Sequence, residues 1–236
     1  MTQWLPLPTQ MECGSGYVYL IGISYDANLH STGYSQFLSP TEKERASKFK
    51  FPIHRERFTF FHACLRNILA RFLHCSPDAL FFFQGEYGKP YLDKKYQLQF
   101  NLSHSENEAI VAITKDAEIG VDIEKVKLER SDDGIAKRFF SPIEYVYLSQ
   151  LDEEKRKEAF FQFWAHKEAF IKATGKGLSQ DLKSFSIGLH PSRLITADNE
   201  CCDEWTIQSF VWKAGFMAAF ATHQINPEIQ FFSYAQ

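Results

Sequence analysis

An internal repeat constrains this chain more than any other feature of its sequence. Phe37–Glu42 (Phe-Leu-Ser-Pro-Thr-Glu) matches Phe139–Glu144 (Phe-Phe-Ser-Pro-Ile-Glu), and Ile21–Asp26 matches Ile119–Glu124. The spacing of the first match continues downstream, where it pairs Phe58 with Phe160, Phe61 with Phe163, and Arg66 with Glu168. Single short matches arise by chance, but several in one order indicate a duplication. The chain is therefore predicted to consist of two similar halves.

Each half has the pattern of a strand, a short capped helix, a long helix and further strands. Residues 17–25 are rich in β-branched and aromatic residues, as strands are. In Ser39–Glu42, the serine can cap a helix, the proline suits its first turn and the glutamate completes a capping box. We expect an α+β fold of two halves related by a pseudo-two-fold axis, each a small, mostly antiparallel sheet packed with a long helix.

The boundary between the halves is expected near residues 115–118. This gives an N-terminal half of residues 1–116, which carries the basic residues, and a C-terminal half of residues 117–236, which carries the clustered carboxylates. Because interfaces between domains favour pockets, the crevice between the halves is the expected ligand site.

The composition is that of a globular protein and excludes several classes. Of 236 residues, 44% are hydrophobic and 23% charged, so the chain can bury a core. The net charge of −3 gives no nucleic-acid signature, and no run of apolar residues is long enough for a membrane span. The five cysteines show no CxxC spacing, and the N-terminus lacks the pattern of a signal peptide. We expect a reduced, cytoplasmic protein.

The stretch from Phe160 to Thr174 is the predicted long helix of the second half. Its apolar residues recur at helical spacing, and Gly175 follows where a left-handed residue would close the helix. Glu168 and Lys172 are four residues apart, so they project from the same side. Taken alone, they would be an ordinary surface ion pair.

Asp122 and Glu124 could join Glu168 in a metal site. They are two residues apart in a predicted strand, so both leave the same face, while Val121 and Ile123 face the core. Together with Glu168 they would form an all-oxygen ligand set suited to Mg²⁺ or Mn²⁺. An isolated Asp-x-Glu is more often the solvated face of an edge strand, and that alternative stays open here.

Basic residues gather in the first half. Arg45 lies on the capped helix, Arg57 begins the long helix, and Lys89 follows in a glycine-containing loop. They could hold a phosphate through charge-assisted hydrogen bonds, or they could be a solvated face balanced by neighbouring glutamates. His104, between two serines in a turn, could bind phosphate or be an ordinary exposed histidine.

An ordered set of motifs carries a family resemblance. The motifs are Gly88-Lys89-Pro90, Phe100-Asn-Leu-Ser-His-Ser105, Ile119-Gly-Val-Asp-Ile-Glu-Lys125, Arg138-Phe-Phe-Ser-Pro-Ile-Glu144 and Trp164-Ala-His-Lys-Glu-Ala-Phe-Ile-Lys172, and the resemblance extends over about residues 17–225. It resembles the Sfp-type 4′-phosphopantetheinyl transferases. That family consists of pseudo-dimeric monomers that move phosphopantetheine from coenzyme A onto a serine of a carrier protein and release adenosine 3′,5′-bisphosphate.

The resemblance implies roles for individual residues. Asp122, Glu124 and Glu168 would hold Mg²⁺ against the diphosphate of coenzyme A, and Glu168 would also be the base for the carrier serine. Lys172 would neutralise the departing phosphate, and Glu144 could assist, although it also suits a capping box. Contacts to coenzyme A are implied for Arg45, Arg57, Lys89, Pro90, Ser103, His104 and Lys172.

The expected partners are coenzyme A and an acyl or peptidyl carrier protein, with no nucleic acid and no membrane, and the chain is expected to be a monomer. The carrier is expected to dock near Lys125, Lys127, Lys137 and Arg138. Three alternatives stay open. A metal-dependent phosphodiesterase or nuclease also uses clustered carboxylates, a glycosidase needs two carboxylates without a metal, and a non-catalytic module could bind coenzyme A or the carrier without turnover.

Overall fold

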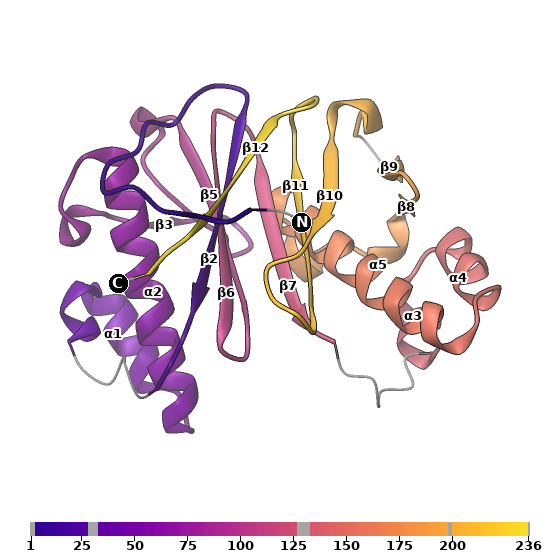
Figure 1. The fold of residues 1–236 in the computed structure, drawn as a ribbon, viewed down its shortest axis with the longest axis horizontal. Coiled ribbons are helices and arrows are strands. Elements are labelled where there is room, and N and C mark those ends of the chain that lie inside the picture. Colours follow the sequence, from indigo (N-terminus) through magenta and orange to yellow (C-terminus); the bar gives the residue numbers. More distant parts are fainter. Residues whose placement is uncertain (1–2, 28–32, 127–132, 198–199, 236) are drawn as a thin grey trace.

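Two sheets lie face to face between two long helices in the computed structural model, which describes residues 3–27, 33–126, 133–197 and 200–235 (Figure 1). The helices are α1 (Pro40–Ser47), α2 (Pro52–Leu73), α3 (Asp133–Phe139), α4 (Pro142–Ser149) and α5 (Glu153–Ala173). Short 3₁₀ turns include η1 (Tyr34–Phe37). None of the described helices is long and apolar enough to cross a bilayer.

The larger sheet has the strand order β1-β12-β2-β6-β5 and the smaller one β10-β11-β7. The strands of the larger sheet are β1 (Leu5–Pro6), β2 (Tyr17–Ser24), β5 (Leu98–Ser105), β6 (Glu108–Lys115) and β12 (Glu228–Ser233). Those of the smaller sheet are β7 (Ile119–Lys125), β10 (Thr206–Phe210) and β11 (Phe216–Thr222). Two hairpins complete the fold, β3 (Phe83–Gln84) with β4 (Pro90–Tyr91), and β8 (Phe185–Leu189) with β9 (Ser192–Ala197).

The predicted fold class is confirmed. In each half, three antiparallel strands pair in the same order, β2-β6-β5 and β7-β11-β10, and a long helix packs on the outer face. The predicted boundary at residues 116 and 117 falls in the connection between β6 and β7. However, β12 returns to pair in parallel with β2 of the first half, so a division into separate domains stays a prediction.

Three hydrophobic clusters hold the layers together. One lies between β2 and α2 and includes Ile21, Ile23 and Phe61. Another joins α5 to the outer face of the smaller sheet through residues such as Phe170 and Ala219. The third lies between the two sheets and takes its residues from β2, β6, β7, β10 and β11. Both sheets are therefore covered on two faces.

Strand register shows which positions of the halves are equivalent. The β2–β6 ladder ends with Ser24 opposite Glu108, and the β7–β11 ladder ends with Lys125 opposite Phe216. One residue further, the amide of Tyr25 donates to the carbonyl of Asn107, and that of Val126 donates to Gly215. The equivalent triplets are therefore Tyr19, Ile21 and Ile23 in β2 and Gly120, Asp122 and Glu124 in β7.

This register corrects the alignment read from the sequence. That alignment paired Ile21 with Ile119, but Ile21 packs towards α2 whereas Ile119 faces the core between the sheets. Pairing Arg66 with Glu168 is wrong by one residue as well. Arg66 forms a buried ion pair with Glu42 of α1, and the residue that repeats this contact in the second half is Lys167. Identical letters in short strands do not fix which face a side chain takes.

Candidate active site between the two halves

A glycine brings α5 unusually close to β7. A Cβ atom on Gly120 would lie 2.1 Å from the carbonyl oxygen of Ala169 and 2.3 Å from the amide nitrogen of Ala173. Only a residue without a side chain fits there. Since Gly120, Asp122 and Glu124 share one face of the strand, this close approach sets both carboxylates against the helix that carries Glu168 and Lys172.

Asp122 is the most buried of the predicted metal ligands, with 3% of its surface exposed. Its Oδ1 atom accepts hydrogen bonds from Lys172 Nζ (2.5 Å) and from Ser103 Oγ (3.0 Å). The ammonium of Lys172 also donates to Ser103 Oγ at 3.0 Å. The three side chains form a closed triangle that joins β5 of the first half to β7 and α5 of the second.

The remaining carboxylates hold protons more tightly than usual. Desolvation, reinforced by the charge of Asp122, raises the pKa of Glu124 to about 7, although Lys172 opposes the shift. Desolvation also raises the pKa of Glu168, against the opposing effect of Lys172 and with the charge of Asp122 adding to it. The mutual effects show that the acidic groups lie within electrostatic reach of one another.

These residues suit a hard divalent cation in their chemistry. Within the described part of the chain, no three His, Cys, Asp or Glu side chains are gathered tightly enough to hold a metal ion as they stand. Lys172 instead supplies the counter-charge to Asp122. The Oδ2 atom of Asp122 is buried without a hydrogen-bond partner among the described residues, as a waiting ligand oxygen would be. The metal site therefore stays a prediction.

Side chains of β5 connect the two sheets beside this triangle. Asn101 Oδ1 accepts from the amide of Val121 (2.9 Å), and Ser105 Oγ accepts from the amide of Lys125 (3.1 Å). Together with Ser103, these residues alternate along one face of β5 and bind successive parts of β7. Sequence reasoning identified Ser103 but missed the linking roles of Asn101 and Ser105.

His54, Arg57, His62 and His104 form the basic group of the first half, which lies within electrostatic reach of Lys172. His104 is exposed at its edge, and its ring stacks on Phe61 with centroids 5.4 Å apart. Desolvation of its covered side and nearby positive charges lower the pKa of His104 to about 4. These charges come from His62, Lys172, Arg57 and His54. The imidazole of His104 is therefore neutral at physiological pH.

The two predicted arginines differ in how they are held. Arg57 donates from Nε to Asn107 Oδ1 at 2.8 Å, in the turn between β5 and β6. Arg45 is exposed on α1, and its guanidinium lies 5.3 Å from the ring centre of Phe58. Phe58 in turn stacks on His62, so Arg45 borders the basic group to which Arg57 belongs.

Lys89 reaches the second half close to Lys172. Lys89 and Lys172 both line a cavity of about 170 Å³ between the halves. The Lys89 ammonium donates to two main-chain carbonyls of the second half, and desolvation lowers the pKa of Lys89 to about 8. Pro90 begins β4 and is half-buried. Its contact to the nucleotide stays a prediction.

Glu144 does not lie among the other predicted catalytic residues. It is 1% exposed, and its carboxylate is taken up by the amides of Ser141 and Ile187 and by the ammonium of Lys167. A fully bonded, buried carboxylate cannot accept a proton from a bound substrate without losing these bonds. The structure therefore shows Glu144 in the capping-box role, and its assistance in catalysis stays a prediction.

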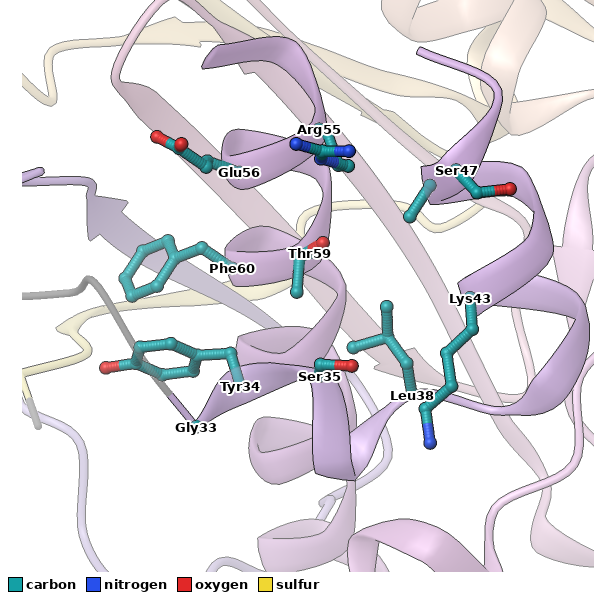
Figure 2. A pocket seen from close by; sticks show the side chains of 11 residues that line it. Gly33, Tyr34, Ser35, Leu38, Lys43, Ser47, Arg55, Glu56, Thr59 and Phe60 are labelled. Atoms are coloured by element: carbon teal, nitrogen blue, oxygen red, sulfur yellow. The ribbon is translucent and has the colours of Figure 1, made fainter. Parts of the chain in front are cut away.

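A separate groove of about 330 Å³ lies on the first half between η1, α1 and α2 (Figure 2). Lys43 and Arg55 stand towards opposite ends of it in Figure 2, with Leu38 and Thr59 between them. None of the predicted site residues lines this groove. It is therefore distinct from the carboxylate site.

Trp164 is another site residue that sequence reasoning missed. Its side chain donates a hydrogen bond to the carboxylate of Glu124. It lies on α5 one turn before Glu168, so helical spacing could have identified it. Gly120 also left a signal, because a glycine inside a strand pattern indicates a close backbone approach.

Of the predicted docking residues, Lys125 directly follows Glu124 in the chain. Lys125 ends β7 and places its ammonium 4.5 Å from the ring centre of Phe216, while Lys137 and Arg138 are in the last turn of α3. Lys127 lies outside the described residues.

Known proteins are similar in sequence to this chain over most of its length. The model of the 4′-phosphopantetheinyl transferase superfamily matches residues 118–222. The 4′-phosphopantetheinyl transferase HetI of Nostoc sp. is 35% identical over 230 residues, which cover 90% of this chain and 97% of that protein. The 4′-phosphopantetheinyl transferase Sfp of Bacillus subtilis is 33% identical over 197 residues, covering 83% and 87% of the two chains.

Solved structures give a more distant likeness. The holo-[acyl-carrier-protein] synthase of Thermotoga maritima is 19% identical, with a TM-score of 0.36, over 46% of this chain and 63% of that one. The holo-(acyl-carrier-protein) synthase of Bacillus anthracis, solved in complex with CoA (3′,5′-ADP), is 21% identical, with a TM-score of 0.37, over 44% of this chain and 93% of that one. The assignment depends instead on the relatives matched along nearly their whole length. This chain belongs to the 4′-phosphopantetheinyl transferase superfamily.

Proposed function

We propose that this chain transfers the 4′-phosphopantetheine group of coenzyme A to a serine hydroxyl of an apo carrier protein and releases adenosine 3′,5′-bisphosphate. One observation carries the proposal. In a chain of this family, Asp122 and Glu124 on β7 face Glu168 and Lys172 on α5, directly beside the basic group of the first half.

In this proposal, Glu168 is the general base. Its raised pKa makes it a better proton acceptor than an ordinary glutamate, and a positioned base contributes about 10²–10⁴-fold to such a step. The serine oxygen forms a bond to the phosphorus of phosphopantetheine. The bond from that phosphorus to the bridging diphosphate oxygen breaks, and its electron pair leaves with adenosine 3′,5′-bisphosphate. Lys172 offers its ammonium to the departing phosphate.

Asp122, Glu124 and Glu168 are the residues that would hold Mg²⁺ or Mn²⁺, which would stabilise negative charge on the diphosphate oxygens. The buried free oxygen of Asp122 and the raised pKa of Glu124 support this assignment. Coenzyme A would lie along the basic group, with Ser103 and His104 near its diphosphate, Lys89 and Pro90 against the nucleotide, and Arg45 and Arg57 near its 3′-phosphate.

The carrier protein, acyl or peptidyl, would approach from the side of Lys125 and α3. We place the reaction in the cytoplasm and propose that one chain suffices, because both halves of the site come from a single chain.

The transfer is direct, with no covalent enzyme intermediate. Trapping a phosphopantetheinylated enzyme after mixing with coenzyme A alone would refute that part of the proposal.

The deciding experiment is the mass of an apo carrier protein incubated with this chain, coenzyme A and Mg²⁺. We expect a gain of one phosphopantetheine, lost on adding EDTA. Hydrolysis of coenzyme A without a carrier would instead indicate a metal-dependent phosphodiesterase. No gain with several acyl and peptidyl carriers, despite binding of coenzyme A, would favour a non-catalytic module.

A further inference from the structure

The backbone of Lys89 belongs to the first half, but its side chain reaches the second half. It follows the tight loop between β3 and β4, in which the amide of Gly88 donates to the carbonyl of Gly85, and the amide of Gly85 donates to the carbonyl of Lys89, both at 2.9 Å. Gly88 has a φ of 84°, which this turn requires. The backbone of Lys89 is therefore fixed before its side chain crosses the crevice.

The ammonium of Lys89 joins two elements of the second half. Its Nζ atom donates to the carbonyl oxygens of Ile119 and Ala173, each at 2.9 Å. Ile119 is the first residue of β7 and Ala173 the last residue of α5. The last carbonyls of a helix lack partners within the helix, and a positive charge at that end is favourable. Lys89 therefore ties the end of the helix to the start of the strand.

These two anchor points adjoin the proposed reaction site. Lys172 immediately precedes Ala173, and Asp122 follows three residues after Ile119. The same helix turn lies against Gly120, where the backbones approach most closely. A shift of the last turn of α5 relative to β7 would move Lys172 away from Asp122, and the 2.5 Å contact between them would lengthen.

We propose that Lys89 is a positioning residue, which holds α5 against β7 through the two main-chain carbonyls and thereby sets the spacing of Lys172 and Asp122. This role goes beyond a contact to the nucleotide, although it rests on the proposed transfer reaction for its kinetic consequence. Two of the three ammonium donors are already used within the protein. Loss of Lys89 therefore affects the geometry of the site before any substrate binds.

Amide hydrogen exchange of the free protein tests the structural step without reference to activity. Lys89→Met removes both hydrogen bonds, so exchange in peptides covering residues 118–125 and 168–176 is expected to become about tenfold faster. Lys89→Arg, which keeps the charge and the donors, is expected to restore most of the protection. Lys94→Met, which removes an exposed lysine nearby, is the control and leaves these peptides unchanged. Unchanged exchange in Lys89→Met would overturn the proposal.

Transfer kinetics test the consequence. Lys89→Met is expected to lower kcat about tenfold, because the spacing of the reacting groups changes. The KM for coenzyme A should stay within about twofold, because the ammonium that this variant removes is bonded within the protein and the methionine keeps an apolar stem against the nucleotide. A raised KM with unchanged kcat would overturn the positioning role in favour of a ligand contact. If the wild-type chain transfers nothing, the proposed function fails, and the exchange experiment still decides whether Lys89 holds α5 to β7.

Discussion

The two halves share one architecture but fill equivalent positions differently. Where the first half packs Tyr19, Ile21 and Ile23 of β2 against α2, the second half sets Gly120, Asp122 and Glu124 against α5. The first arrangement is a closed aromatic and aliphatic core. The second exchanges that core for a glycine contact and two carboxylates, which cost stability unless they are paired. A duplicated frame can therefore support a reaction site in one copy because the other copy keeps an intact core.

Both halves keep the same contact between the short helix and the long helix. Each begins its short helix with a capping box, at Ser39 and at Ser141, and each ties the capping glutamate to a buried cation of the long helix. These contacts fix how the short helix meets the long one. They lie away from β2 and β7, so the strands could diverge in chemistry without loss of the helix pair.

The largest effect is expected at Glu168. Glu168→Gln removes the proposed base, so kcat should fall by about 10²–10⁴-fold with little change in the fold. Asn67 is its counterpart in the first half, and the Asn67 side chain bonds its own helix at Ala63. Asn67→Ala should leave the transfer rate within about twofold. Equal losses in steady-state assays of both variants would break the assigned equivalence.

The buried ion pairs should differ in their effect on stability. Lys167 and Glu144 both have side chains with 0% exposure, whereas Glu42 is 11% exposed and also bonds His62. Lys167→Met should therefore lower the free energy of unfolding by about 3–5 kcal/mol, and Arg66→Met by less. Urea denaturation measures both values. Lys48→Met, at an exposed helix pair, should have no measurable effect, and a larger loss for Arg66→Met than for Lys167→Met would contradict this ranking.

Alanine at Gly120 and at Gly22 compares a backbone contact with a side-chain contact. At Gly120 the new methyl would meet the backbone of α5, whereas at Gly22 it would meet the ring of Trp212 at 2.5 Å. Gly120→Ala should cost about 1–3 kcal/mol of stability and lower kcat, because the helix must move. Gly22→Ala should keep kcat within about twofold, since Trp212 is half-buried and can shift. Thermal melts and transfer rates measure the two effects, and full activity of Gly120→Ala would show that the close approach is dispensable.

The smallest effect concerns pH. Glu124 has a pKa of about 7 in the folded chain, above the ordinary value of 4.5, whereas its counterpart Ile23 cannot titrate. The folded protein binds this proton more readily than the unfolded chain, so stability rises as pH falls through 7 towards 4.5. Between pH 8 and pH 6, without divalent ions, Tm should rise by roughly 2–4 °C more in the wild type than in Glu124→Gln. Equal slopes in calorimetry would contradict this assignment.

Some features of the site follow from local spacing in the sequence, and others follow only from contacts between distant residues. The shared face of Asp122 and Glu124 follows from the two-residue period of a strand, and the shared side of Glu168 and Lys172 follows from helical spacing. Both were predictable, and so was the family, from the motif order. The occupied carboxylate of Glu144 was not, because the partners that neutralise it, Lys167 and the amide of Ile187, lie far along the chain.

The sequence by itself determined the local elements. The capping boxes, the long helices and the alternation along β7 all arise from contacts within a few residues, which any chain with these letters would favour. Only the tertiary structure decided which face of each strand meets its helix, that Lys172 binds Asp122, and that Lys89 crosses to the second half. Those outcomes depend on packing between segments far apart in sequence, where burial of each face as a whole outweighs the likeness of a few letters.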